Sequence, residues 1–367
     1  DDEQQIELDS VSPSTTEGSS TNLGIRLAYQ PSGTVNVSIA SSDTDAASLG
    51  AASVSFNASN YNIYQTVALT GEQDNDTQDE NVTITVSSTG LTNQLATLSV
   101  ADDDTQDIIV SANSLTIGEG GSQTFTVSLA FNPVSDLNVG ISTADPNLAT
   151  ATPNTLTFTE ANYNAGLVVT VNAPEDVDVA DDTVDLTVSA GSLPGNTETI
   201  AVTINDNDTQ ALVVSPTSLE ITENSSENVS VSLAFQPSSD VSVSLTSADI
   251  AVATVDANQA SLTFTAANYN QVQTVAITAQ DDQNTSENST TVNVTSTGLT
   301  TVPVAITAPD DDVQNIIVSQ TNLPLTEGGG ASTFTVRLAF APAATINLNV
   351  ADSTNSGKIT IAGGPDL

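Results

Sequence analysis

The chain has 367 residues and is strongly acidic, with 45 Asp and Glu against 3 Lys and Arg, a formal net charge of −42. Nucleic acids and anionic membranes are therefore poor partners, because both repel such a chain. The chain has neither Cys nor His, which excludes disulfides and disfavours zinc, copper and iron sites. It has no run of about 18 apolar residues, so we expect no membrane-embedded segment.

An acidic stretch recurs at even spacing. Asp102-Asp103-Asp104 has close copies that end at Asp208 and Asp312, each 104 residues after the last. This period predicts a tandem array of domains: repeat 1 (1–106), repeat 2 (107–210), repeat 3 (211–314) and an incomplete repeat 4 (315–367). Because the next strand starts soon after each acidic stretch, we expect neighbouring repeats almost in contact. The start at Asp1-Asp2-Glu3 resembles the end of a preceding repeat, which is typical of a piece of a longer protein.

Within a repeat, short runs rich in Val, Thr, Leu and Ile follow one another, several with period-two alternation. In repeat 2 the runs are Ser114–Ile117, Gln123–Ala130, Leu137–Thr143, Thr155–Thr159, Leu167–Val171, Val184–Ser189 and Thr199–Ile204, and Ala149–Ala151 is a candidate for a further short strand. Seven runs separated by turns predict an all-β fold, a seven-stranded antiparallel immunoglobulin-like β-sandwich, repeated along a linear rod.

Two landmarks recur inside the repeats. A Leu-Ala-aromatic motif followed by Pro begins at Leu27, Leu129, Leu233 and Leu338, and we expect its Leu and aromatic side chains to enter the core. The motif Asn-Tyr-Asn is centred on Tyr61, Tyr163 and Tyr269. We expect a corner Tyr packed under a turn there, with Asn side chains bonding the backbone.

Strand parity predicts that the acidic residues of each repeat gather at one end of its sandwich. The turn after the first strand, the end of the third, the loop between the fifth and sixth, and the end of the seventh all lie at that pole. The candidate metal-ligating residues are Glu17, Asp43, Asp74, Asp76, Asp79, Glu80, Asp102, Asp103 and Asp104 in repeat 1; Glu119, Asp145, Glu175, Asp176, Asp178, Asp181, Asp182, Asp206 and Asp208 in repeat 2; and Glu223, Asp249, Asp281, Asp282, Glu287, Asp310, Asp311 and Asp312 in repeat 3.

So many neighbouring carboxylates cannot all stay ionised without a counter-charge. Basic side chains are too few to supply it, which favours a hard divalent cation, and Ca²⁺ accepts 6–8 oxygens in flexible geometry. The alternative is a uniformly acidic surface adapted to salt. Asn207, Asn284 and Asn288 stand where other repeats carry acids, so the number of ions can differ between repeats.

These motifs resemble Calx-β domains, especially those strung together in large bacterial surface and secreted proteins. The resemblance rests on the Glu119-Gly120 turn before Phe125-Thr126-Val127-Ser128-Leu129, the acidic loop, the terminal acidic stretch and the segment Leu156–Asn164. It covers the three complete repeats and the first half of the fourth. It implies an immunoglobulin-like sandwich that binds Ca²⁺ at its C-terminal pole through the positions above.

The pattern predicts an extracellular, non-enzymatic role: a calcium-stiffened stalk or filament segment of a bacterial surface adhesin or fibre, with neighbouring repeats or subunits as its partners. The sequons, such as Asn36, suit this location. Glycan- or protein-binding adhesion is an alternative, although aromatic residues are few. Catalysis is disfavoured because the acids recur at every junction and no His can serve as a base.

Repeat 4 leaves two interpretations open. Strands are expected from Ile316–Ser319 through Ile346–Val350, with a possible further strand near Lys358–Ile361, but the later strands are missing. Either this is an excerpt of a longer array that supplies them, or another subunit supplies them by strand addition and builds a fibre.

Overall fold

The computed structural model describes residues 3–193, 196–353 and 357–362, and these form β-strands, turns and loops. The chain divides into two compact units, Asp1–Asp176 with Asp181–Asp206, and Val177–Ala180 with Asn207–Leu367. In the described ranges, no helix has the length and apolar character needed to cross a membrane.

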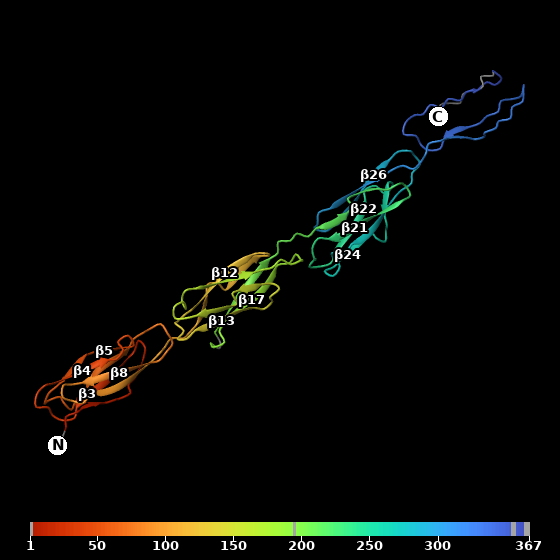
Figure 1. Ribbon diagram of the computed structural model, residues 1–367. Coiled ribbons are helices and arrows are strands. Elements are labelled where there is room, and N and C mark those ends of the chain that lie inside the picture. Colours follow the sequence, from red (N-terminus) through yellow and green to blue (C-terminus); the bar gives the residue numbers. More distant parts are fainter. Residues whose placement is uncertain (1–2, 194–195, 354–356, 363–367) are drawn as a thin grey trace. The chain divides into compact units, whose positions relative to one another are not determined.

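The first unit contains two β-sandwiches (Figure 1), and the first of them belongs to repeat 1. One sheet has the order β1-β3-β7-β5, with β1 (Ile6–Leu8), β3 (Ser20–Leu27), β7 (Gln65–Gly71) and β5 (Ala47–Leu49). The other has the order β2-β9-β8-β4-β6, with β2 (Ser14–Thr16), β9 (Gln94–Ala101), β8 (Glu80–Ser87), β4 (Val35–Ser41) and β6 (Ser53–Phe56).

The second sandwich of this unit, in repeat 2, has the same arrangement. Its four-stranded sheet is β10-β12-β16-β14, with β10 (Ile108–Val110), β12 (Ser122–Leu129), β16 (Leu167–Asn172) and β14 (Thr150–Thr152). Its five-stranded sheet is β11-β18-β17-β13-β15, with β11 (Ser114–Gly118), β18 (Thr197–Asn205), β17 (Asp182–Ser189), β13 (Leu137–Thr143) and β15 (Thr155–Phe158).

The second unit holds the sandwich of repeat 3 and a small sheet in repeat 4. The sandwich pairs the sheet β19-β21-β25-β23, with β19 (Leu212–Ser215), β21 (Ser226–Leu233), β25 (Gln273–Ala279) and β23 (Ala253–Val255), and the sheet β20-β27-β26-β22-β24, with β20 (Ser218–Glu220), β27 (Val302–Ala308), β26 (Asn288–Ser296), β22 (Val241–Ser247) and β24 (Ser261–Phe264). The small sheet consists of β28 (Ile316–Val318) and β29 (Val336–Leu338).

Each sandwich encloses a hydrophobic core of its own. Along β8, the side chains of Val82, Ile84 and Val86 are buried and alternate with more exposed neighbours. This period-two pattern places one face of each strand inside, as the sequence predicts. Phe158, at the end of β15, is fully buried, and each sandwich has a Phe at the equivalent position. Each sandwich therefore has the apolar burial that an independent fold needs.

The prediction of β-sandwich repeats is confirmed, but each complete repeat has nine strands among its described residues rather than seven. The first strand is divided, because the chain changes sheets after β1: β1 pairs antiparallel with β3, whereas β2 pairs parallel with β9. The sandwich is thus not wholly antiparallel. The short strand anticipated at Ala149–Ala151 forms one residue later, as β14.

Repeat 4 corrects two expectations. The strand predicted at Ile346–Val350 and the possible strand near Lys358–Ile361 are not formed. In repeat 1 the corresponding third strand, β4, is held between β6 and β8. The described residues after 314 form no counterpart of either neighbour, so 346–350 lacks the hydrogen-bond partners that a strand requires.

The landmark predictions are partly correct. Leu27, Leu129 and Leu233 are buried, whereas Leu338 is only partly buried. Tyr163 packs against the core, and its carbonyl accepts a hydrogen bond from Leu129 N at 2.7 Å. The Oδ1 of Asn162 accepts a hydrogen bond from the backbone N–H of Thr159 at 2.6 Å, as expected. The aromatic side chains were placed wrongly: Tyr29 is 43% exposed, and Phe131 is only partly buried. The strand ends at Leu129, so the bend that follows takes the aromatic off the core face.

Candidate metal centre

Glu17 is a buried acid in repeat 1, and its position is set by the backbone on both sides. It follows β2 directly, and its N–H donates to Ala101 O, at the end of β9, at 3.0 Å. The next residue, Gly18, has φ 63° and donates from its N–H to Gly71 O, at the end of β7, at 3.0 Å. Gly tolerates this left-handed conformation without strain. The turn therefore holds Glu17 between two strand ends, and its side chain is only 3% exposed.

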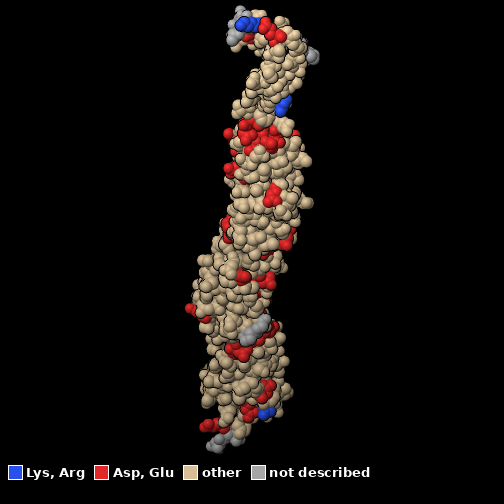
Figure 2. Space-filling model, turned by 90° about the vertical axis from the view of Figure 1, so that its right-hand side faces the viewer, with Lys and Arg blue, Asp and Glu red and all other residues tan. Residues whose placement is uncertain are grey.

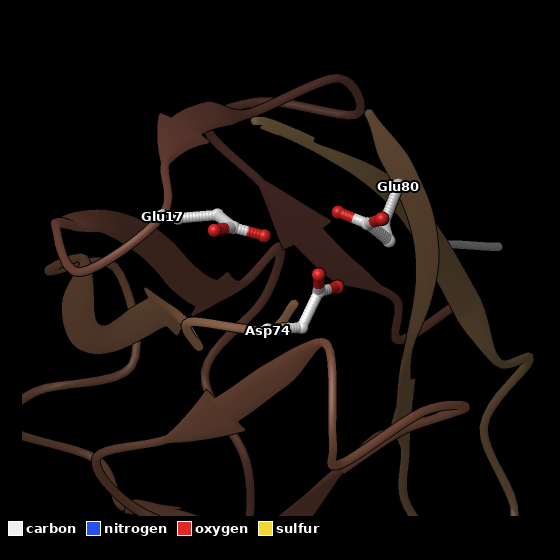
Figure 3. A group of neighbouring side chains, drawn as sticks. All are labelled: Glu17, Asp74 and Glu80. Atoms are coloured by element: carbon white, nitrogen blue, oxygen red, sulfur yellow. The ribbon is translucent and has the colours of Figure 1, made fainter. Parts of the chain in front are cut away.

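Two other segments bring carboxylates to Glu17. Asp74 comes from the loop after β7, Glu80 opens β8, and the oxygens of Glu17, Asp74 and Glu80 lie within 4.8 Å of one another. Figure 3 shows the three carboxylates pointing toward one another from separate segments of the fold. Asp74 also forms a second group of this kind with Asp76 and Asp102, where Asp102 follows β9. Residues far apart in sequence thus meet at one end of the sandwich.

The acids of repeat 1 lack the hydrogen bonds that buried carboxylates need. Both oxygens of Glu17, Oε2 of Glu80 and Oδ2 of Asp102 are buried without a hydrogen-bond partner. Burial, followed by the charges of Asp74 and Asp102, raises the pKa of Glu17. Burial, followed by the charges of Asp74 and Glu17, raises the pKa of Glu80 to about 7. A buried charge without a partner is unfavourable, so the site favours either protons or a cation.

Repeats 2 and 3 also gather acids around the buried Glu, in groups of different composition. Glu119, Asp176 and Asp206 form one group within 4.8 Å, and burial with the charges of Asp176 and Asp206 raises the pKa of Glu119 to about 7. In repeat 3, Glu223 belongs to two such groups, one with Asp282 and Asp310 and one with Asp281 and Asp311. Glu223 is 2% exposed, and its Oε1 has no hydrogen-bond partner.

The other candidate acids lie outside these groups among the described residues. They are Asp43, Asp79, Asp103 and Asp104; Asp145, Glu175, Asp178, Asp181, Asp182 and Asp208; and Asp249, Glu287 and Asp312.

Several of these acids serve in turns or brace the site. Asp43 accepts a hydrogen bond from Asp45 N at 3.0 Å, and Asp145 and Asp249 make the same contact two residues on. Asp79 accepts from Asp102 N at 2.9 Å and so fixes the chain at the end of β9. Their role as metal ligands stays a prediction.

The composition of each group suits a hard cation. Every candidate ligand atom is a carboxylate oxygen, which Ca²⁺ and Mg²⁺ prefer. Arg26, a basic residue in the sandwich of repeat 1, forms a salt bridge with Glu7 at 2.8 Å and stacks on Tyr64. On the face drawn in Figure 2, acidic side chains gather in clusters separated by stretches with few charged groups. The charge is therefore concentrated rather than spread evenly, at least on this face.

A glutamine after each acidic stretch has a structural role that the sequence analysis missed. Gln106 Nε2 donates to Phe131 O at 2.8 Å, and Phe131 N donates to Gln106 Oε1 at 3.1 Å. Gln4, Gln210 and Gln314 hold Tyr29, Phe235 and Phe340 in the same way. The recurrence of Gln in the junction motif was the available signal. This pair of hydrogen bonds fixes the turn that the Leu-Ala-aromatic motif forms.

That turn contacts the acidic loop of the preceding repeat. Asn132, next to Phe131, donates from its N–H to Asn75 O at 2.7 Å, and Asn75 lies between Asp74 and Asp76. In the second unit, Ala341 N donates to Gln283 O at 2.8 Å, and Gln283 follows Asp282. The loop that carries the acids is thus the loop that bonds the next repeat.

No protein-family model matches the chain, and no curated protein matches it in sequence. Similar solved structures include domains 4 and 5 of the S-layer protein SbsC, with 17% identity over 56% of this chain and 98% of that chain, at a TM-score of 0.27. The Escherichia coli adhesin FdeC shows 13% identity over 84% of this chain and 97% of its own, at 0.27. The protocadherin GammaB4 extracellular domain shows 14% identity over 92% of this chain and 56% of its own, at 0.36.

These identities and TM-scores are too low to assign a function to the chain. The Calx-β resemblance stays a prediction that rests on its motifs.

Proposed function

We propose that the chain is a calcium-stiffened stalk or filament segment of an extracellular surface protein. The observation that carries this proposal is Glu17: a carboxylate buried to 3% exposure, with neither oxygen hydrogen-bonded, that faces Asp74 and Glu80. A divalent cation there would neutralise the group and supply the missing partners. In repeat 3, Glu223 supports the same role, since its Oε1 is also buried without a partner.

The link between cation and stiffness is the loop after β7. Asp74 and Asp76 are its ligand candidates, and Asn75 between them bonds Asn132 of repeat 2. An ion that fixes both aspartates also fixes the peptide group between them, and so orders the acceptor of that bond. Without the ion, repulsion between the carboxylates loosens the loop. Calcium therefore sets how firmly one repeat holds the next, which decides the shape of a linear array.

Ca²⁺ fits this role better than Mg²⁺, because ligands from several loops suit its flexible coordination by 6–8 oxygens. No feature of the described residues favours glycan binding over a structural role. Partners in this proposal are neighbouring repeats or further copies of the same array.

Small-angle scattering of the full chain in calcium and in chelator tests the proposal, with far-UV circular dichroism recorded in parallel. We expect the β-signal to persist in chelator, because each sandwich keeps its own core, while the scattering profile changes to that of a more flexible chain. Restoring low-millimolar Ca²⁺ should reverse the change, whereas the same ionic strength of NaCl should not. Identical profiles with and without calcium would rule the role out.

A further inference from the structure

The acidic loop of repeat 3 differs from the others at two positions. Counting from Gly71 at the end of β7, the fifth and ninth residues are Asp76 and Glu80. Repeat 2 also has acids at both positions, whereas repeat 3 has Asn284 and Asn288. The third residue, Asp74 in repeat 1, is still an acid in repeat 3, namely Asp282.

Both amides bind this remaining acid. Asn284 Nδ2 donates to Asp282 Oδ1 at 2.6 Å, and Asn288 Nδ2 donates to Asp282 Oδ2 at 2.7 Å. The orientation of the Asn284 amide is fixed, because its Oδ1 accepts a hydrogen bond from Ser286 N at 2.8 Å. Each oxygen of Asp282 therefore has an amide donor, and the two amides stand at the positions of the acids Asp76 and Glu80 in repeat 1.

Repeat 1 has the opposite arrangement. Its fifth and ninth loop residues are carboxylic acids instead of amides, and Glu80 Oε2 is buried without a hydrogen-bond partner. Glu17 and Glu223 are alike in that each has a buried oxygen without a hydrogen-bond partner, so the difference between the two repeats lies in the loop. In repeat 3 the amides thus supply partners for both oxygens of Asp282, while Glu223 Oε1, Asp310 Oδ2 and Asp312 Oδ2 are still buried without a hydrogen-bond partner.

We propose that repeat 3 binds at least one Ca²⁺ fewer than repeat 1, and that the amides of Asn284 and Asn288 take the place of that ion at Asp282. This inference rests on the proposed calcium role and specifies how much calcium each repeat binds. The group of Glu223, Asp281 and Asp311 remains for a cation in repeat 3. The loop around Asp282 keeps its fold without calcium, so the bond from Ala341 N to Gln283 O persists when the equivalent loop of repeat 1 loosens.

Counting bound Ca²⁺ on the full chain by equilibrium dialysis, with affinities from calorimetry, tests this exchange in both directions. We expect Asn284→Asp with Asn288→Asp to gain one ion per chain, and Asp76→Asn with Glu80→Asn to lose at least one. The matched control is Asn258→Asp, since Asn258 is exposed in repeat 3 and its Nδ2 also donates to an aspartate, Asp256, at 3.2 Å. This control should bind like the wild type.

Amide hydrogen exchange of the wild-type chain in chelator supplies a second readout. We expect protection to persist in the loop 282–288 and to be lost in the loop 74–80. The inference is overturned if the double Asn→Asp variant binds the same number of ions with the same affinity as the wild type. It is also overturned if both loops lose protection equally. Absence of calcium binding in every variant would instead overturn the proposed function itself.

Discussion

Replacing Glu17 with Gln should stabilise repeat 1 in calcium-free protein and destabilise it in calcium-loaded protein. Without calcium, the wild-type carboxylate is buried beside Asp74 and Glu80 with both oxygens unpartnered. A buried polar group without a partner costs about 1–3 kcal/mol, and a charged one costs more. Gln removes the charge and adds an amide donor that can bond a neighbouring carboxylate. We therefore expect the calcium-free variant to gain on the order of 1 kcal/mol in the free energy of unfolding of repeat 1.

With calcium the sign changes. At a free concentration of about 100 times the dissociation constant, a bound ion stabilises the folded state by ~2.7 kcal/mol. If loss of the Glu17 ligand weakens binding about 100-fold, the same concentration contributes only ~0.4 kcal/mol. The variant loses ~2.3 kcal/mol from the ion and keeps its gain of about 1, so it ends roughly 1 kcal/mol less stable than the wild type.

Amide hydrogen exchange in β8 measures the opening free energy of repeat 1 inside the full chain. The control is Glu3→Gln, which removes the same charge from an exposed position and should change neither state. If Glu17→Gln is destabilising to the same extent with and without calcium, Glu17 is a structural residue and the cation argument is wrong.

Two further results are expected. In calcium-free protein, the free energy of unfolding of repeat 1 should fall as pH rises from about 4.5 to about 7, because folded Glu80 keeps a proton over the window in which the unfolded chain has released it. A denaturant series across this range that shows no such fall would contradict the environment described for Glu80. Gln106→Leu should lower the stability of repeat 2 by about 1–3 kcal/mol, since two hydrogen bonds to Phe131 are lost. Protection of β12 should drop accordingly, whereas Gln271→Leu, at an exposed position, should leave every repeat unchanged.

The sandwich was predictable because its signal is local. Alternation along segments such as Val82, Ile84 and Val86 follows from the pleat of a strand and needs no knowledge of its neighbours. The position of a strand in a sheet is not local information. The division of the first strand into β10 and β11 depends on which sheet each part joins, and the three residues of β10 are too few to show alternation.

The gathering of acids was also predictable, because strand parity alone brings Glu17, Asp74 and Asp102 to one end. The choice among acids was not. An Asp at the end of a strand is equally suited to bind a cation or to accept hydrogen bonds from the backbone two residues on, as Asp43 does. The two uses have the same residue type at the same place in the chain. They differ in whether the oxygens already have partners, which only the folded contacts reveal.

The core and the acidic end of a repeat have separate roles, because the unsatisfied charge lies outside the core. Most buried apolar residues belong to the strands, while the unpartnered carboxylates of repeats 1 and 3 lie in turns and at strand ends. Removal of the proposed cation should therefore perturb the loops before the core, and in repeat 1 the loop concerned is the one that bonds Asn132. In the proposed stalk, the array exchanges stiffness for flexibility while its domains stay folded. On the same proposal, the substitution of amides for acids in repeat 3 sets which junctions respond to calcium, without any change in the sandwich itself.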